Sequence, residues 1–130
     1  MDQIAFLGTG LLGSGMVDSM LRRGVAVTVW NRTVEKMAPL AAAGARAAST
    51  PEDAVASADE VHMVLPDDEV VDAMLDRIGP HLRASATVID HSTTSPSGTK
   101  HRLPRMAERG MRFLHAPVFM SPQMARESAG

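Results

Sequence analysis

Short apolar runs alternate with amphipathic segments along almost the whole chain. The apolar runs are rich in Val, Ile, Leu and Ala, as is typical of buried strands. We therefore predict strands at residues 4–8, 25–30, 60–66, 86–90 and 111–118.

The segments between these runs have the apolar spacing of helices. Val71, Met74 and Ile78, for example, would share one helical face. Prolines interrupt two of the segments: we expect Pro39 to kink its helix or to delay its start, and Pro104 to weaken the other. Helices are predicted at residues 11–24, 33–44, 50–58, 67–79 and 95–110.

Strands and helices thus alternate, with short connections between them. This alternation favours a parallel sheet that is covered by helices on both faces. We predict an α/β fold of the Rossmann type, a doubly wound parallel sheet in a single domain over residues 1–130. A chain of 130 residues is long enough for one domain with a hydrophobic core.

Composition narrows the classes of function. Apolar residues make up 45% and charged residues 22% of the chain, which is ordinary for a soluble globular protein. The net charge of -2 gives no electrostatic reason to expect nucleic acid or an anionic membrane as a partner. Cysteine is absent and neither His62 nor His91 has a partner at metal-ligand spacing, so no metal is predicted. No apolar run has transmembrane length, so we expect a cytoplasmic protein.

A glycine-rich stretch directly follows the first predicted strand. In "FLGTGLLGSGM", three glycines have the spacing G-x-G-x-x-G between a strand and a helix. The first allows a tight turn, the second makes room for a pyrophosphate and the third lets the helix pack closely, so the pattern favours dinucleotide binding over a purely structural turn. The predicted cofactor contacts in this loop are Gly8, Thr9, Gly10, Leu11, Leu12 and Gly13.

The end of the second predicted strand is where such a domain selects its cofactor. A site for NAD usually has a carboxylate there, about 20 residues after the glycines, to bind the ribose 2′-hydroxyl. This chain has the neutral Asn31, followed by Arg32, whose guanidinium can hold a 2′-phosphate. Thr33 can add a hydroxyl or cap the next helix, and Arg32 could also be an ordinary surface arginine. We predict NADP as the cofactor, with NADPH preferred over NADH.

Five motifs together resemble a known family. The segments "FLGTGLLGSGM", "VTVWNRT", "VLPDD", "IDHSTTSP" and "RFLHAPV" have the order and spacing of the cofactor domain of the β-hydroxyacid dehydrogenases. This family includes 3-hydroxyisobutyrate dehydrogenase, has 6-phosphogluconate dehydrogenase as a relative, and shares the domain with imine reductases. The resemblance covers nearly the whole chain. It implies an NADP-dependent oxidoreductase that transfers hydride to or from a small hydroxy acid, a semialdehyde or an imine.

The resemblance also implies roles nearer the substrate. Leu65 and Pro66 match the family's turn against the cofactor, and Ser92 and Thr93 match the segment at the nicotinamide and the substrate. Hydroxyls at the carboxyl end of a parallel strand face the ligand crevice, although the segment Ser92–Ser95 can also simply cap the helix that Pro96 opens. We therefore predict cofactor contacts from Leu65, Pro66 and Thr93, and a substrate contact from Ser92.

The last motif departs from the family pattern. His115 replaces an aspartate, and Phe119, Met120 and Ser121 replace a Ser-Gly-Gly segment whose backbone helps to bind the substrate carboxylate in the family. These bulky side chains should block that backbone cradle, which favours a more apolar substrate, as in imine reductases. We predict His115 on the substrate side, either as an acid/base group or, preferably, as a hydrogen-bonded residue at the strand end.

The family's general acid/base is a lysine in a second, all-helical domain. Lys36 and Lys100, the two lysines of this chain, do not match that motif, so no catalytic residue is predicted here. We expect residues 1–130 to be the N-terminal cofactor domain, with the helical domain absent from this chain. The alternative is a stand-alone dinucleotide-binding or sensing module without catalysis. Loss of the helical domain would expose apolar surface, through which the chain could form a homodimer.

Overall fold

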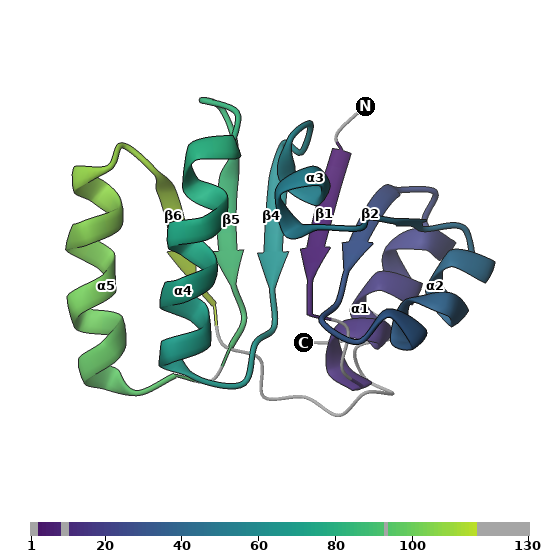
Figure 1. Ribbon diagram of the computed structural model, residues 1–130, viewed down its shortest axis with the longest axis horizontal. Coiled ribbons are helices and arrows are strands. Elements are labelled where there is room, and N and C mark those ends of the chain that lie inside the picture. Colours follow the sequence, from purple (N-terminus) through teal and green to yellow (C-terminus); the bar gives the residue numbers. More distant parts are fainter. Residues whose placement is uncertain (1–2, 9–10, 93, 117–130) are drawn as a thin grey trace.

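The computed structural model describes residues 3–8, 11–92 and 94–116. These residues form one parallel sheet in the order β3-β2-β1-β4-β5-β6 (Figure 1). The chain therefore winds outward from β1 in one direction and from β4 in the other, which confirms the predicted doubly wound Rossmann-type sheet. The strands are β1 (Gln3–Leu7), β2 (Ala26–Trp30), β3 (Arg46–Ala47), β4 (Glu60–Met63), β5 (Thr87–Asp90) and β6 (Arg112–His115).

Helices cover the sheet on both faces. Figure 1 shows α3, α4 and α5 on one side, and α1 and α2 on the other. Two short 3-10 helices, η1 (Val34–Met37) and η2 (Gly79–His81), complete the connections. The α-helices are α1 (Leu11–Arg22), α2 (Ala38–Ala42), α3 (Pro51–Val55), α4 (Asp68–Ile78) and α5 (Pro96–Glu108).

Each face of the sheet has its own hydrophobic core, because successive strand side chains point to opposite faces. Phe6 packs with α1 and α2, in a cluster with Val17 and Leu40. Its neighbour Leu7 packs on the other face, in a cluster with Leu75 of α4 and Met106 of α5. Burial on both faces explains why the strands appear in the sequence as continuous apolar runs.

Side-chain caps begin three of the described helices. Asp53 N–H donates to Thr50 Oγ1 at 3.0 Å at the start of α3. Val70 N–H donates to Asp67 Oδ1 at 2.9 Å at the start of α4. Ser95 caps α5 in the same way. Such caps satisfy N–H groups that have no partner inside the helix.

The strands and helices predicted from the sequence are all present, with shifted ends. The prediction missed β3, which has two residues, both exposed. Pro39 delays its helix as expected, because η1 precedes α2 and the proline stands in the first turn of α2. Pro104 lies inside α5, which continues through it. Of the last predicted strand, residues 117–118 lie outside the described residues.

Candidate functional site

A glycine turn joins β1 to α1 at the carboxyl edge of the sheet. Gly8 has φ of +88°, a left-handed conformation that favours glycine, and its N–H donates to the Trp30 carbonyl at 2.9 Å. A side chain at Gly8 would overlap the carbonyl of Val64. A Cβ at Gly13 would lie 2.6 Å from the Gly8 carbonyl oxygen. The backbone of α1 thus passes directly against the turn, as the motif requires.

The N-terminus of α1 completes this turn. The first N–H groups of a helix lack intrahelical partners and form the positive end of its dipole, so they can bind phosphate. Leu11 and Leu12 are the first two residues of α1. Thr9 and Gly10, which we also predict to contact the cofactor, lie outside the described residues.

A groove of about 470 Å³ opens beside the turn, where the sheet changes winding direction. The carboxyl ends of β1, β2 and β4 and the first turns of α4 form its walls. Ligands of doubly wound sheets bind in this position. The lining residues are Gly8, Trp30, Asn31, Arg32, Thr33, Lys36, Val64, Leu65, Pro66, Val70 and Met74.

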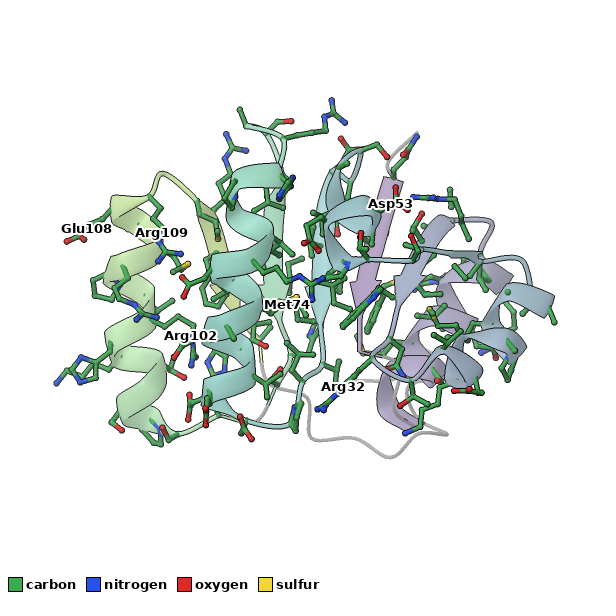
Figure 2. All side chains as sticks on the ribbon, in the orientation of Figure 1. Arg32, Asp53, Met74, Arg102, Glu108 and Arg109 are labelled. Carbon is green, nitrogen blue, oxygen red and sulfur yellow. The ribbon has the colours of Figure 1, made fainter. Side chains whose placement is uncertain are left out.

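One end of the groove is positively charged. The side chains of Arg32 and Lys36 are exposed and, within the described parts of the chain, make no hydrogen bond or ion pair; Arg32 lies at the carboxyl edge of the sheet (Figure 2). The Asn31 side-chain amide donates to the Thr33 carbonyl at 2.9 Å, which holds this turn. Thr33 is the N-cap residue of η1, but its side chain makes no capping hydrogen bond. Among the described lining residues there is no aspartate or glutamate.

Ser92 connects the groove to the next strand. It is 1% exposed, and its Oγ accepts a hydrogen bond from Leu65 N–H at 2.7 Å. Its own N–H donates to Asp90 Oδ1 at 2.9 Å. The hydroxyl therefore ties the turn after β4, which carries Leu65 and Pro66, to the turn after β5. Thr93, the neighbouring predicted contact, lies outside the described residues.

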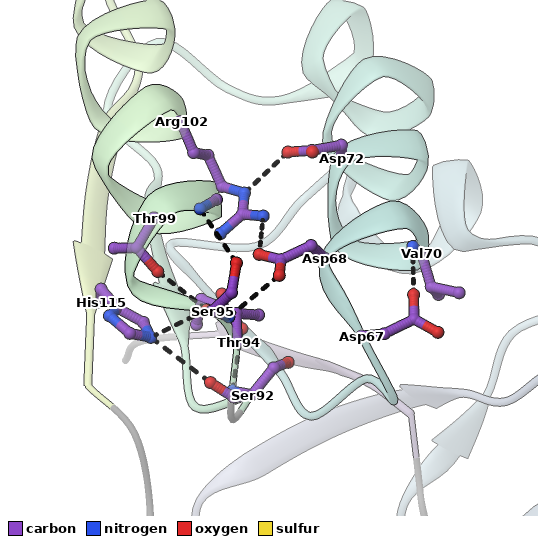
Figure 3. Close-up of polar contacts among 12 residues, drawn as sticks. Asp67, Asp68, Val70, Asp72, Ser92, Thr94, Ser95, Thr99, Arg102 and His115 are labelled. Carbon is purple, nitrogen blue, oxygen red and sulfur yellow. Dashed lines mark hydrogen bonds and ion pairs between the residues drawn. The ribbon is translucent and has the colours of Figure 1, made fainter.

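His115 lies at the end of β6, beside the turn after β5 (Figure 3). Its Nε2 lies 3.4 Å from Thr94 Oγ1 and 3.4 Å from the Ser92 carbonyl oxygen. Thr94 Oγ1 lies 2.8 Å from Thr99 Oγ1. Ser95, rather than Ser92, caps α5, with its Oγ 3.0 Å from Gly98 N. Phe119, Met120 and Ser121, the family departures beyond His115, lie outside the described residues.

A buried arginine joins α4 to α5 next to this turn (Figure 3). The Arg102 side chain is 0% exposed and donates to Asp72 Oδ1 and Asp68 Oδ1, both at 2.7 Å. The Ser95 N–H donates to Asp68 Oδ2 at 2.9 Å. The hydrogen bond from Arg102, helped by Ser95, lowers the pKa of Asp68 to about 2. These charges hold two helices together.

The structure adds groove residues that the sequence did not reveal. Trp30 and Met74 supply apolar walls, and Val70 lies one turn before Met74 on α4. Lys36 lies in η1, one turn after Arg32 and Thr33. That spacing was visible in the sequence, but Pro39 had obscured where the helix begins.

Neither a membrane-spanning helix nor a metal-binding cluster is found among the described residues. No helix in the described residues is both long and apolar enough to cross a membrane. No three potential ligands among the described His, Asp and Glu side chains gather into a metal site.

A glycine turn, a helix that begins directly after it and a groove at the switch point are the features of a dinucleotide-binding domain of the Rossmann type. Comparison with known proteins agrees with this class. Residues 3–129 match the family described as the NAD binding domain of 6-phosphogluconate dehydrogenase, and the chain belongs to this family.

Curated relatives include both enzymes and other proteins. The chain is 34% identical over 130 residues to the cytokine-like nuclear factor N-PAC of Xenopus tropicalis. This match covers 96% of this chain and 24% of that protein. It is 34% identical over 127 residues to the chloroplastic glyoxylate/succinic semialdehyde reductase 2 of Arabidopsis thaliana, with 95% and 36% covered. The chain thus spans about a quarter to a third of the length of these relatives.

Solved structures show the same domain. The 3-hydroxyisobutyrate dehydrogenase of Mycobacterium tuberculosis, with L-serine, has a TM-score of 0.93 and 30% identity over 98% of this chain and 44% of its own. An imine reductase of Myxococcus stipitatus in complex with NADP+ has a TM-score of 0.88 and 28% identity, with 94% and 43% covered. A variant of that enzyme in complex with NAD+ has a TM-score of 0.89 and 25% identity, with 95% and 43% covered. The chain is therefore a pyridine-nucleotide-binding domain of the type found in 3-hydroxyisobutyrate dehydrogenase.

Proposed function

We propose that this chain is the NADP(H)-binding domain of an oxidoreductase. Its partner in the reaction would be a small hydroxy acid or semialdehyde, or an imine. The glycine turn matches a dinucleotide site, since a side chain at Gly8 or Gly13 would collide with the neighbouring backbone, and the groove lies where ligands of doubly wound sheets bind. NADP(H) would supply the hydride, and the chain's own residues would bind and orient it.

The observation that carries the cofactor proposal is a pair of cations at one end of the groove, whose side chains have no ionic partner among the described residues. Arg32 can hold a 2′-phosphate through two charge-assisted hydrogen bonds, and Lys36 can add a point charge. Asn31 stands where a carboxylate would repel that phosphate. The Thr33 hydroxyl, which does not cap η1, can add a further hydrogen bond.

The single tryptophan, Trp30, lines the groove and gives a direct test. Its fluorescence is titrated with NADP+ and with NAD+. A charge-assisted hydrogen bond contributes about 1.5–3 kcal/mol, so NADP+ should bind about 10- to 150-fold more tightly. Arg32→Ala should remove most of this preference. Arg23→Ala also deletes one arginine, but Arg23 follows the C-terminal end of α1, whereas the glycine turn lies at its N-terminal end. This variant should leave the preference unchanged. Equal affinities of the unmutated protein for both nucleotides would contradict the NADP proposal.

We place the substrate beside Ser92 and His115. Both lie at the carboxyl edge of the sheet: the Ser92 hydroxyl accepts a hydrogen bond from Leu65 N–H, and His115 Nε2 lies 3.4 Å from the Ser92 carbonyl oxygen. Because this region lacks a free proton donor of the expected lysine type, we propose that catalysis requires an all-helical domain beyond residues 1–130. The substitutions at positions 119–121 support a substrate more apolar than a small hydroxy acid.

Activity measurements separate binding from catalysis. Hydride transfer needs a positioned proton donor or acceptor and a wall that excludes water. The 130-residue chain should therefore bind NADPH but should not oxidise it with semialdehydes, ketoacids or cyclic imines. Clear turnover would place a catalytic group within residues 1–130, and His115→Ala would then be the first variant to measure.

A stand-alone binding or sensing module is the second candidate. The similarity to N-PAC, whose name is that of a nuclear factor and not of an enzyme, favours it. A longer reading frame with a lysine-bearing helix would support the enzyme, whereas a stop codon after Gly130 would support the module. We keep the cytoplasm as the proposed location and a homodimer as the proposed assembly, to be measured by fractionation and by sedimentation.

A further inference from the structure

Two histidines lie side by side within the sheet. His62 on β4 is 7% exposed, and His91 follows β5 on the same face, two residues beyond Ile89, the register partner of His62. Their ring centroids are 5.1 Å apart, and Phe6 of β1 stacks on His62 at 5.6 Å. His62 Nδ1 lies 2.8 Å from His91 Nε2. The two rings lie edge to edge, with 11° between their planes, and share one hydrogen bond.

The outer nitrogens of this pair also have partners. His62 Nε2 lies 3.1 Å from Glu60 Oε1, and His91 Nδ1 lies 3.0 Å from the carbonyl oxygen of Ala116. A carboxylate and a carbonyl can only accept hydrogen bonds. All hydrogens in the three contacts must therefore come from the two imidazoles.

Counting hydrogens shows that the neutral pair is one short. A neutral imidazole carries one N–H, so two of them supply two hydrogens for three contacts. When both rings are neutral, one contact brings two lone pairs together and is repulsive. One additional proton makes His62 an imidazolium and satisfies every contact in the series.

We propose that Glu60, His62 and His91 form a one-proton latch, in which proton uptake by the histidine pair fixes the Glu60 side chain to the sheet. In the closed latch, His62 donates to Glu60 and to His91, and His91 donates to the Ala116 carbonyl. In the open latch, His91 still donates to the Ala116 carbonyl. The N–H of Ala116 is itself bonded to the Asp90 carbonyl at 2.8 Å. The Glu60 side chain, 38% exposed, then turns to solvent.

The surroundings set the pH range of the latch. Burial lowers the pKa of both histidines below the ordinary value, so acidification is needed to close it. The hydrogen bond to Glu60 opposes this shift at His62, and the hydrogen bond to the Ala116 carbonyl, followed by the charge of Asp90, opposes it at His91. On β6, Arg112 occupies the same register row as Glu60, two strands away, and β1 contributes an uncharged aromatic ring.

The latch is tested by nitrogen-15 NMR of the histidine side chains, which reports the tautomer and the charge of each ring. We expect His62 and His91 to bind one proton between them as the pH falls. In the neutral form both should carry hydrogen on Nδ1. The exposed His81 and His101 lie outside this pair and provide reference signals in the same spectra. Two independent protonations of the pair, or hydrogen on His91 Nε2 in the neutral form, would overturn the proposal.

Glu60→Gln gives a sharper test because an amide can donate. The amide N–H can donate to His62 Nε2, so each of the three contacts has a hydrogen without an extra proton. Loss of the counter-charge should also lower the proton affinity of the pair by about tenfold or more. Glu108→Gln makes the same change at the exposed end of α5 and should have no effect (Figure 2). An unchanged proton affinity in a folded Glu60→Gln variant would refute the latch.

Discussion

Two charged clusters near the carboxyl edge of the sheet use their arginines in opposite ways. Beside β2, Arg32 is exposed and, among the described residues, has no hydrogen-bond or ion-pair partner. Between α4 and α5, Arg102 is fully buried and bonded to Asp68 and Asp72. The first arginine keeps its hydrogen-bond donors available for a ligand, whereas the second uses them to join two helices. Burial and partners, rather than residue type, separate a binding charge from a structural one.

Breaking the structural cluster should have the largest effect. Arg102→Met removes the buried guanidinium and leaves Asp68 and Asp72 without it. We expect the free energy of unfolding to fall by about 3 kcal/mol, with NADP+ affinity unchanged in the folded protein. Arg105 donates to the same Asp72 at 2.9 Å but is 47% exposed, so Arg105→Met should cost less than about 1 kcal/mol. Urea denaturation followed by circular dichroism measures both. Equal losses would contradict the contrast between the clusters.

This contrast also shows what the sequence could reveal. The glycine turn was predictable, because its spacing between a strand and a helix has a direct geometric cause at Gly8 and Gly13. Asn31 and Arg32 were predictable as groove residues for the same reason, since a second parallel strand must end beside the first.

Other features depend on strand register and helix packing, which no local pattern encodes. His62 and His91 are 29 residues apart and meet because β4 and β5 align them. Arg102 is buried because α5 packs on α4, although its segment appears polar in the sequence. The strand β3 was missed because two exposed residues have no periodicity. Lys36 was missed because the expected helix opens as a 3-10 turn.

A carboxylate placed beside Arg32 and Lys36 should reverse the preference of the groove for NADP+ over NAD+. Asn31→Asp brings a negative charge to the turn beside Arg32, where it repels a 2′-phosphate and can accept a hydrogen bond from a ribose hydroxyl. We expect NADP+ affinity to fall about tenfold, a change of about 1.4 kcal/mol, and NAD+ affinity to rise. Asn31→Ala is the matched control, because it also removes the bond to the Thr33 carbonyl but adds no charge. If both variants have the same nucleotide preference, charge is not the selector.

Removing the second cation should have a smaller effect. Lys36→Ala deletes an exposed point charge, which contributes about 0.5–1 kcal/mol at such a site. NADP+ affinity should therefore fall about two- to fivefold, and NAD+ affinity should stay constant. Lys100→Ala removes the other lysine of the chain, on the exposed side of α5, and should change neither affinity. An equal loss for both nucleotides in Lys36→Ala would place the lysine at the pyrophosphate and not at the 2′-phosphate.

The smallest expected effect is a pH dependence of stability that originates in the structural cluster. The hydrogen bond from Arg102 lowers the pKa of Asp68 from 3.8 to about 2. Between these values the unfolded chain binds more protons than the folded chain at this carboxyl, so acid favours unfolding. The contribution of Asp68 is therefore complete above its unfolded pKa and is lost as the pH falls toward 2.

Urea midpoints measured from about pH 5 down to about pH 2 test this dependence. Asp68→Asn cannot titrate, so it should be less stable than the unmutated protein at the upper end of the range and should approach it at the lower end. Asp18→Asn makes the same change at a carboxylate whose partner, Arg22, is 56% exposed, and serves as the matched surface control. If Asp68→Asn runs parallel to the unmutated protein across the whole range, Asp68 does not contribute to acid sensitivity. Convergence at low pH would show instead that the buried guanidinium acts on a carboxylate that must stay ionised to hold α4 against α5.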